Sequence, residues 1–223
     1  MGGRGSSSSI GPRPGAGGPP PAWTQTVGIK VADNLKDAIG KKGPEKTVGD
    51  AMIASNPYYS PDYREYSENC QRVVVAYEAR RRGYDVTALP TFNGDTLSGI
   101  AYNDTKNGIR RGRWMGAFQG AEPVNVSSST ERGVLNNIDK QMANYGEGSR
   151  GVVQIFYKGG GGHVFNVERK NGKTTYIEAQ VGKVKNFGDT LKNVKTGEVA
   201  LVRTDNLKLS DRARNFVTQS NGG

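Results

Sequence analysis

The sequence predicts an α+β fold in which helices come first and an antiparallel sheet follows. Apolar residues recur at helical spacing in two segments before residue 146, whereas β-branched and aromatic runs dominate from residue 150 onward. Within those runs, Asn171–Gly172 separates two alternating segments, which is the strongest short-range signal for a hairpin. We therefore expect N-terminal helices packed on a sheet that contains this hairpin.

The first clear helix is expected over NCQRVVVAYEARRRG, residues 69–83. The apolar residues that share one face of it are Cys70, Val73, Val74 and Tyr77. Asn69 is a favoured N-cap type and Gly83 a typical residue just beyond a helix end. The predicted helix therefore begins at Cys70 and presents one apolar face to the core.

A second helix is expected over SSSTERGVLNNIDKQMANYG, residues 127–146. Ser128 and Glu131 have the spacing of a capping box, and Gly146 ends the pattern. The apolar face of this helix consists of Leu135, Ile138 and Met142.

Strands are expected over DVTALP, RGVVQIFYK, the two halves of the hairpin, and EVALVR. Residues 91–129 are expected to be rich in loops, with Trp114 and Phe118 packed as a pair in the core. The last segment, TDNLKLSDRARNFVTQSNGG, is interpreted as a polar tail.

The chain is expected to divide into a flexible region, residues 1–50, and a folded domain, residues 51–223. Residues 1–22 are dominated by Gly, Ser and Pro, and such a segment buries too little apolar surface to offset its ordering entropy. We expect these residues to be disordered. Residues 23–50 have room for one short helix before Gly43–Pro44.

The composition excludes several classes of protein. No run approaches the ~18 apolar residues of a transmembrane helix, and the polar start MGGRGSSSSIGPRPG lacks the apolar region of a secretory signal. Cys70 is the single cysteine and His163 the single histidine among 223 residues. These counts exclude an intramolecular disulfide framework and a thiolate zinc site, so no metal is expected.

The net charge of +10 raises the hypothesis that the protein binds nucleic acid. Residues 151–223 carry most of the excess, with 12 basic and 6 acidic residues; the spaced lysines of this part include Lys183, Lys185, Lys192 and Lys195. No aromatic residues that would stack on bases alternate with these lysines, so a solvated basic face is the favoured interpretation. The triplet Arg80–Arg82 ends the first helix, where the helix dipole favours cations.

The hairpin places an acid or an amide beside the histidine. A two-residue turn at Asn171–Gly172 fixes a register in which His163 faces Gln180 and Phe165 faces Glu178. Because side chains alternate between the faces of a sheet, all four lie on one face.

Cys70 is expected to be a reactive thiol because it follows Asn69 at the start of a helix. Unpaired N–H groups and the helix dipole lower the pKa of a thiol there, and the same groups can hold a tetrahedral oxyanion. The lone histidine, His163, supplies the base. The residues thus predict Cys70 as nucleophile, His163 as base and either Glu178 or Gln180 as the group that orients the imidazole.

The segments NCQRVVVAYEARRRGYDVTALP and GSRGVVQIFYKGGGGHVFNVERKNGKTTYIEAQVG resemble the papain-fold toxin family, which is associated with glutamine deamidases and papain-like peptidases. That family combines an Asn-Cys at a helix start, a Gly-His-x-Phe-Asn strand and an acid two residues before a Gln. The resemblance covers residues 56–205. It implies a papain-like fold, a catalytic set of Cys70, His163 and Glu178, supporting roles in orientation or the oxyanion hole for Gln180 and Asn69, and no cofactor.

Within that family, the sequence is most similar to the form found in head and minor capsid proteins of tailed phages. NCQR, VAYE and RRRGYDV carry this similarity, together with RTDNLK at residues 203–208. Glu178 stands where the family usually has Asp, and its side chain is one methylene longer. Val73 stands where the phage relatives often have a second Cys, which argues against a dithiol role.

These observations predict a Cys-His-Glu hydrolase of phage or prophage origin that deamidates a glutamine in a protein substrate. Peptide-bond cleavage uses the same thioester chemistry and stays open as the other enzymatic option. A structural module of the phage head on the same fold is the alternative from another class, with phage head proteins as partners. Nucleic-acid binding is supported only by the net charge, and no membrane partner is expected. The expected location is the bacterial host cytoplasm or the virion.

Overall fold

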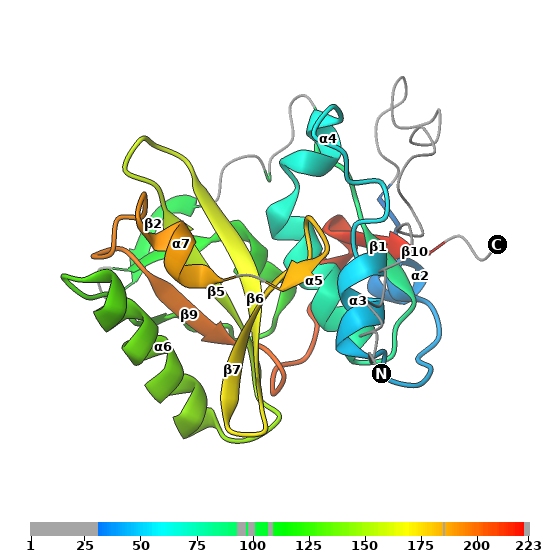
Figure 1. Ribbon diagram of the computed structural model, residues 1–223. Coiled ribbons are helices and arrows are strands. Elements are labelled where there is room, and N and C mark those ends of the chain that lie inside the picture. The colour runs from blue at the N-terminus through cyan, green and yellow to red at the C-terminus, as the bar shows by residue number, and fades with distance from the viewer. Residues whose placement is uncertain (1–30, 93–96, 98–100, 107–108, 185, 221–223) are drawn as a thin grey trace, which may run out of the picture.

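A six-stranded antiparallel sheet separates the core of the protein into two layers (Figure 1). The computed structural model describes residues 31–92, 97, 101–106, 109–184 and 186–220. In spatial order, the strands of the sheet are β4 (Val124–Asn125), β9 (Ala200–Arg203), β5 (Arg150–Phe156), β6 (Gly162–Lys170), β7 (Lys173–Glu178) and β8 (Lys183–Val184).

Helices cover both faces of this sheet. On one face, α6 (Glu131–Tyr145) and α7 (Phe187–Leu191) pack against side chains such as Phe165 and Val153. On the other face lies α5 (Cys70–Arg81), flanked by α2 (Leu35–Ile39), α3 (Val48–Ala54) and the 3-10 helix η1 (Arg113–Ala117). The short helix α4 (Arg64–Ser67) leads into α5. The expected α+β fold with an antiparallel sheet is confirmed.

The helix α5 begins at Cys70, as predicted, but it is buried on more than one face. Its apolar face contacts the sheet, and the expected solvent-facing side is covered as well, so that Arg72, Glu78 and Arg80 are also buried. The reason is a second layer beyond α5, formed by α2, α3 and the strand pair β1 (Val86–Ala88) and β10 (Val217–Gln219) (Figure 1).

Ion pairs compensate the charges that α5 buries. The carboxylate of Glu78 lies 2.8 Å from Arg82 Nε and 2.9 Å from Arg150 Nη2. Arg81 Nε lies 2.6 Å from Glu168 Oε1 on β6. Arg81 therefore joins the end of the helix to β6, in addition to the expected interaction with the helix dipole. All three arginines of the triplet Arg80–Arg82 form ion pairs within the protein rather than being displayed to nucleic acid.

The C-terminal segment is packed, contrary to the polar tail that we predicted. It forms the 3-10 helix η2 (Asp211–Asn215) and then β10, which pairs antiparallel with β1. Ala213, Phe216 and Val217 are buried in the same cluster as α5. These three buried residues lie among charged ones, so the hydrophobic pattern of the segment is too short to predict a strand.

Residues 91–129 contain more regular structure than predicted. In the described part, β2 (Ala101–Lys106) and β3 (Ile109–Gly112) pair antiparallel, and η1 follows. The expected core pair is confirmed, since Trp114 and Phe118 are buried with ring centroids 6.3 Å apart.

The start of α6 differs from the predicted capping box of Ser128 and Glu131. The N-cap is Thr130, whose side chain accepts a hydrogen bond from the N–H of Gly133. Ser128 Oγ instead accepts from the N–H of Thr130. Gly146 ends the helix at a positive φ, as expected.

The packing begins before residue 51, the expected start of the folded domain. The short helix expected before Gly43–Pro44 is α2, and its residues Ala38 and Ile39 are buried in the core. The boundary drawn at residue 50 thus leaves out part of the packed chain. The disorder expected for residues 1–22 lies outside the described residues.

We predict that Glu78→Gln lowers the free energy of unfolding by about 3–5 kcal/mol, because it leaves Arg82 and Arg150 without their buried carboxylate. Urea unfolding followed by circular dichroism measures this loss. Glu45→Gln, at an exposed acid, is the control and should stay within about 0.5 kcal/mol of the wild type. Equal stability of the two variants would contradict the role given to Glu78.

Candidate active site

Cys70 is the first residue of α5 and is 9% exposed. The helix starts here because the carbonyl of Asn69 already accepts bonds from the N–H groups of Arg72 at 2.8 Å and Val73 at 3.1 Å. The N–H groups before Arg72 have no carbonyl a turn earlier in the helix, and they point out of its N-terminal end. A thiolate or an oxyanion at this end is stabilised by them and by the dipole.

Asn69 occupies the N-cap position but does not cap the helix with its side chain, contrary to our expectation. Its φ of −98° and ψ of 23° differ from the extended conformation that a capping side chain needs. The buried side chain instead donates to Asn56 Oδ1 at 3.0 Å and to the carbonyl of Leu89 at 3.4 Å. Asn69 therefore fixes the backbone before Cys70, and it does so by hydrogen bonds to other segments.

The structure brings His163 to Cys70 and to Glu178. His163 Nε2 lies 2.6 Å from Glu178 Oε2, and the imidazole is also hydrogen-bonded to the Cys70 thiol. Because Nε2 is engaged by the carboxylate, Nδ1 is the ring nitrogen left for sulfur. Only 12% of the His163 side chain and 7% of the Glu178 side chain are exposed, so both interactions are largely shielded from water.

Burial by itself lowers the pKa of His163, but this effect is outweighed. The negative charge of Glu178 and the hydrogen bonds to Cys70 and Glu178 favour the imidazolium, and together they raise the pKa of His163 from 6.5 to about 10. The ring is therefore protonated at neutral pH, and the site is arranged for a cationic imidazole between two acceptors.

The hairpin register that predicted this arrangement is confirmed as far as the ladder extends. Asn171 and Gly172 both have positive φ, 53° and 71°, as a tight two-residue turn requires, and the pairing runs from Lys170–Lys173 to Asn166–Ile177. β7 ends at Glu178, so the ladder does not include the predicted pairs Phe165–Glu178 and His163–Gln180.

Gln180, the alternative orienting group, is used elsewhere in the structure. Its Nε2 donates to the carbonyl of Ser67 at 2.5 Å, just before α5. Its own carbonyl accepts from Asn56 Nδ2 at 3.0 Å. Of the two candidates that the sequence left open, Glu178 is the one that contacts His163.

Asn56 is the residue that our sequence reasoning missed. Its buried amide donates to the carbonyls of Tyr66 and Gln180 and accepts from Asn69. It thereby ties the segment before the thiol to the segment that follows Glu178. The only signal for it in the sequence was its place at the start of the tyrosine-rich stretch NPYYSPDY, which does not indicate a partner.

No metal centre accompanies these residues: among the residues that the structure describes, no group of three or more His, Cys, Asp or Glu side chains is placed to hold an ion. In the same described ranges, no helix combines the length and apolar character that crossing a membrane requires.

A model of a known protein family matches the chain. Its description is papain fold toxin 1, glutamine deamidase, and it matches residues 68–183, a span that starts just before Cys70 and extends past His163, Glu178 and Gln180. Comparison with curated proteins and with solved structures gave no match. The phage-head context that we expected from the sequence has no support in these comparisons.

We predict that His163 stays protonated through neutral pH and titrates only as the pH approaches 10. The folded pKa lies above the ordinary value of 6.5, so the proton is lost on the alkaline side. Glu178→Gln removes the favourable charge and should lower the pKa. Because the chain has one histidine, nitrogen-15 NMR of the ring follows this residue alone.

The matched control is Glu147→Gln, which alters an acid at the opposite end of the same hairpin, where Glu147 accepts from the N–H groups of Asn171 and Gly172. This variant should leave the titration of His163 in place. A wild-type midpoint near 6.5, or a midpoint that Glu178→Gln does not move, would contradict the ion pair.

Proposed function

This chain belongs to the papain fold toxin 1, glutamine deamidase family, a family of cysteine-dependent amidohydrolases, and we propose that it deamidates a glutamine side chain in a protein substrate. The catalytic residues of this proposal are Cys70, His163 and Glu178. The observation that carries it is the imidazole of His163, hydrogen-bonded to the thiol and 2.6 Å from the carboxylate of Glu178.

In the first half of the reaction, the Cys70 thiolate attacks the carbonyl carbon of the glutamine side chain. The oxygen of that carbonyl becomes an oxyanion, which the N–H groups at the start of α5 stabilise. The C–N bond then breaks as the His163 imidazolium gives its proton to the leaving nitrogen. Ammonia departs, and an acyl thioester joins the substrate to Cys70.

In the second half, the neutral imidazole of His163 takes a proton from water, and the resulting hydroxide attacks the thioester carbon. The C–S bond breaks, the thiolate is restored beside the imidazolium, and the substrate leaves with a glutamate in place of its glutamine. Glu178 remains ionised and orients the ring through both halves. Each step uses groups of this chain and water.

A peptidase would use the same steps on a backbone amide, and the two activities differ only in which amide reaches Cys70. The family description supports the glutamine side chain. A purely structural role in a phage head does not require a thiol, an imidazole and a carboxylate that are hydrogen-bonded one to the next. Phage or prophage origin stays part of the proposal on the strength of the sequence resemblance alone.

We predict that the wild type releases ammonia from terminally blocked glutamine peptides or from proteins of a bacterial lysate. Cys70→Ala and His163→Ala should abolish the release, and Glu178→Gln should lower kcat by about 10²- to 10⁴-fold because the ring loses its orienting charge. Ammonia is measured enzymatically, and mass spectrometry locates each conversion of glutamine to glutamate.

Glu147→Gln again serves as the control and should retain full activity. Bond cleavage that depends on Cys70, without any conversion of glutamine, would replace the deamidase proposal by a peptidase. Identical products from the wild type and Cys70→Ala would contradict both activities.

A further inference from the structure

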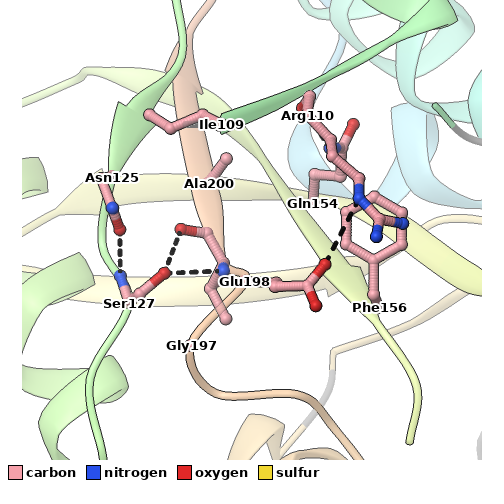
Figure 2. Close-up of a pocket in the computed structure, with 10 residues that line it drawn as sticks. Ile109, Arg110, Asn125, Ser127, Gln154, Phe156, Gly197, Glu198 and Ala200 are labelled. Atoms are coloured by element: carbon pink, nitrogen blue, oxygen red, sulfur yellow. Dashed lines mark hydrogen bonds and ion pairs between the residues drawn. The ribbon is translucent and has the colours of Figure 1, made fainter. Parts of the chain in front are cut away.

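We propose that a cavity beside the active site is a subsite for an acidic side chain of the substrate protein, near the target glutamine in its sequence. This inference rests on the proposed function and adds a substrate class to it. The cavity has a volume of about 260 Å³, below the range of about 300–1,000 Å³ for sites that hold a whole ligand, and is suited to one side chain. Its lining comes from β3, β4, β5, β9 and the segments beside them: Ile109, Arg110, Asn125, Ser127, Gln154, Phe156, Gly197, Glu198, Val199 and Ala200 (Figure 2).

The cavity lies on the same face of the sheet as α5 and close to the catalytic residues. Phe156 in its wall is paired with Gly162, the residue before His163. The wall of the cavity thus lies on the strand next to β6, one register position from His163.

Hydrogen bonds connect the wall of the cavity to the residue after the nucleophile. Gln71 Oε1 accepts from the N–H of Trp114, and Trp114 Nε1 donates to Gln154 Oε1, both at 3.1 Å. Gln154 Nε2 in turn donates to the carbonyl of Arg110 at 2.9 Å. The position of the cavity relative to Cys70 is therefore fixed by the fold.

Arg110 is the side chain best placed to recognise a carboxylate. Its guanidinium lies over the ring of Phe156, 5.0 Å from the centroid, and its side chain is 48% exposed. Its nearest acid in the cavity is Glu198, at 3.5 Å from Nε, which is longer than a hydrogen bond (Figure 2). Arg110 is thus held by a cation–π contact with Phe156 and by a long ion pair with Glu198. Its planar guanidinium can bind a carboxylate through two parallel N–H groups.

A second cation lies beside the acid of the cavity. Lys195 Nζ lies 3.6 Å from the other oxygen of Glu198, and the backbone N–H of Lys195 bonds to the carbonyl of Phe156. Two cations, Arg110 and Lys195, thus share the single carboxylate of Glu198. An acidic side chain is therefore attracted to this site, and a basic one is repelled.

The experiment uses blocked peptides in which glutamine is replaced by its diazoketone analogue, 6-diazo-5-oxonorleucine, with Glu, Ala or Lys at the flanking positions. The thiolate of Cys70 attacks the carbon that bears the diazo group, a proton is added, and N₂ leaves. Mass spectrometry of the full chain gives the rate of labelling. We expect the Glu peptide to label Cys70 about tenfold faster than the Lys peptide, which corresponds to about 1.4 kcal/mol.

Two variants test whether the cavity is the cause. Arg110→Glu should reverse the order of the peptides, and Glu198→Gln, which removes the competing acid, should increase the preference for Glu. Arg132→Gln, at an exposed arginine of α6 on the other face of the sheet, is the control and should keep the wild-type order. Thermal melts establish that each variant is folded.

Equal rates for the three peptides, or an order that neither cavity variant changes, would overturn the subsite and leave the proposed deamidation intact. If none of the peptides labels Cys70 while iodoacetamide does, the glutamine proposal itself fails, and the subsite fails with it. The two proposals are therefore distinguished by the same set of measurements.

Discussion

The helix α5 is enclosed on nearly every side, and its polar side chains need partners inside the protein. Glu78 of the helix binds Arg82 and Arg150 of β5, and Arg81 of the helix binds Glu168 of β6, so these ion pairs join the C-terminal half of the helix to the sheet. These pairs fix the position of the helix on the sheet, because a shift would separate buried charges. Its first residue, Cys70, is consequently presented at the beginning of β6, where His163 lies.

The two ends of α5 are held by different chemistry. Charged pairs hold the C-terminal end, whereas neutral amides hold the end that carries the thiol: Asn56 and Asn69 on one side, Gln71 and Trp114 on the other. The amides do not titrate near neutral pH and add no charge to compete with the thiolate and the imidazolium. The electrostatics of the site is then determined chiefly by Glu178, whose charge opposes the effect of burial on His163.

The sequence predicted the parts of the site that depend on local pattern. The Asn171–Gly172 turn requires positive φ at both positions, and this fixed the register that brings Glu178 to His163. Asn56 and the cavity around Arg110 could not be predicted, because their partners come from segments far away in the chain and a buried amide leaves no periodic signal. Strand β10 was missed for a related reason, since it is short and its partner β1 lies far away in the sequence.

The central claim is that the fold holds Cys70 and His163 as a thiolate–imidazolium pair. The most direct test is the rate of Cys70 alkylation by iodoacetamide as a function of pH, in the wild type and in His163→Ala. We predict that at neutral pH the wild type is alkylated much faster than His163→Ala, because the imidazolium keeps the sulfur in its reactive thiolate form. Equal rates in the two proteins across the pH range would contradict the account.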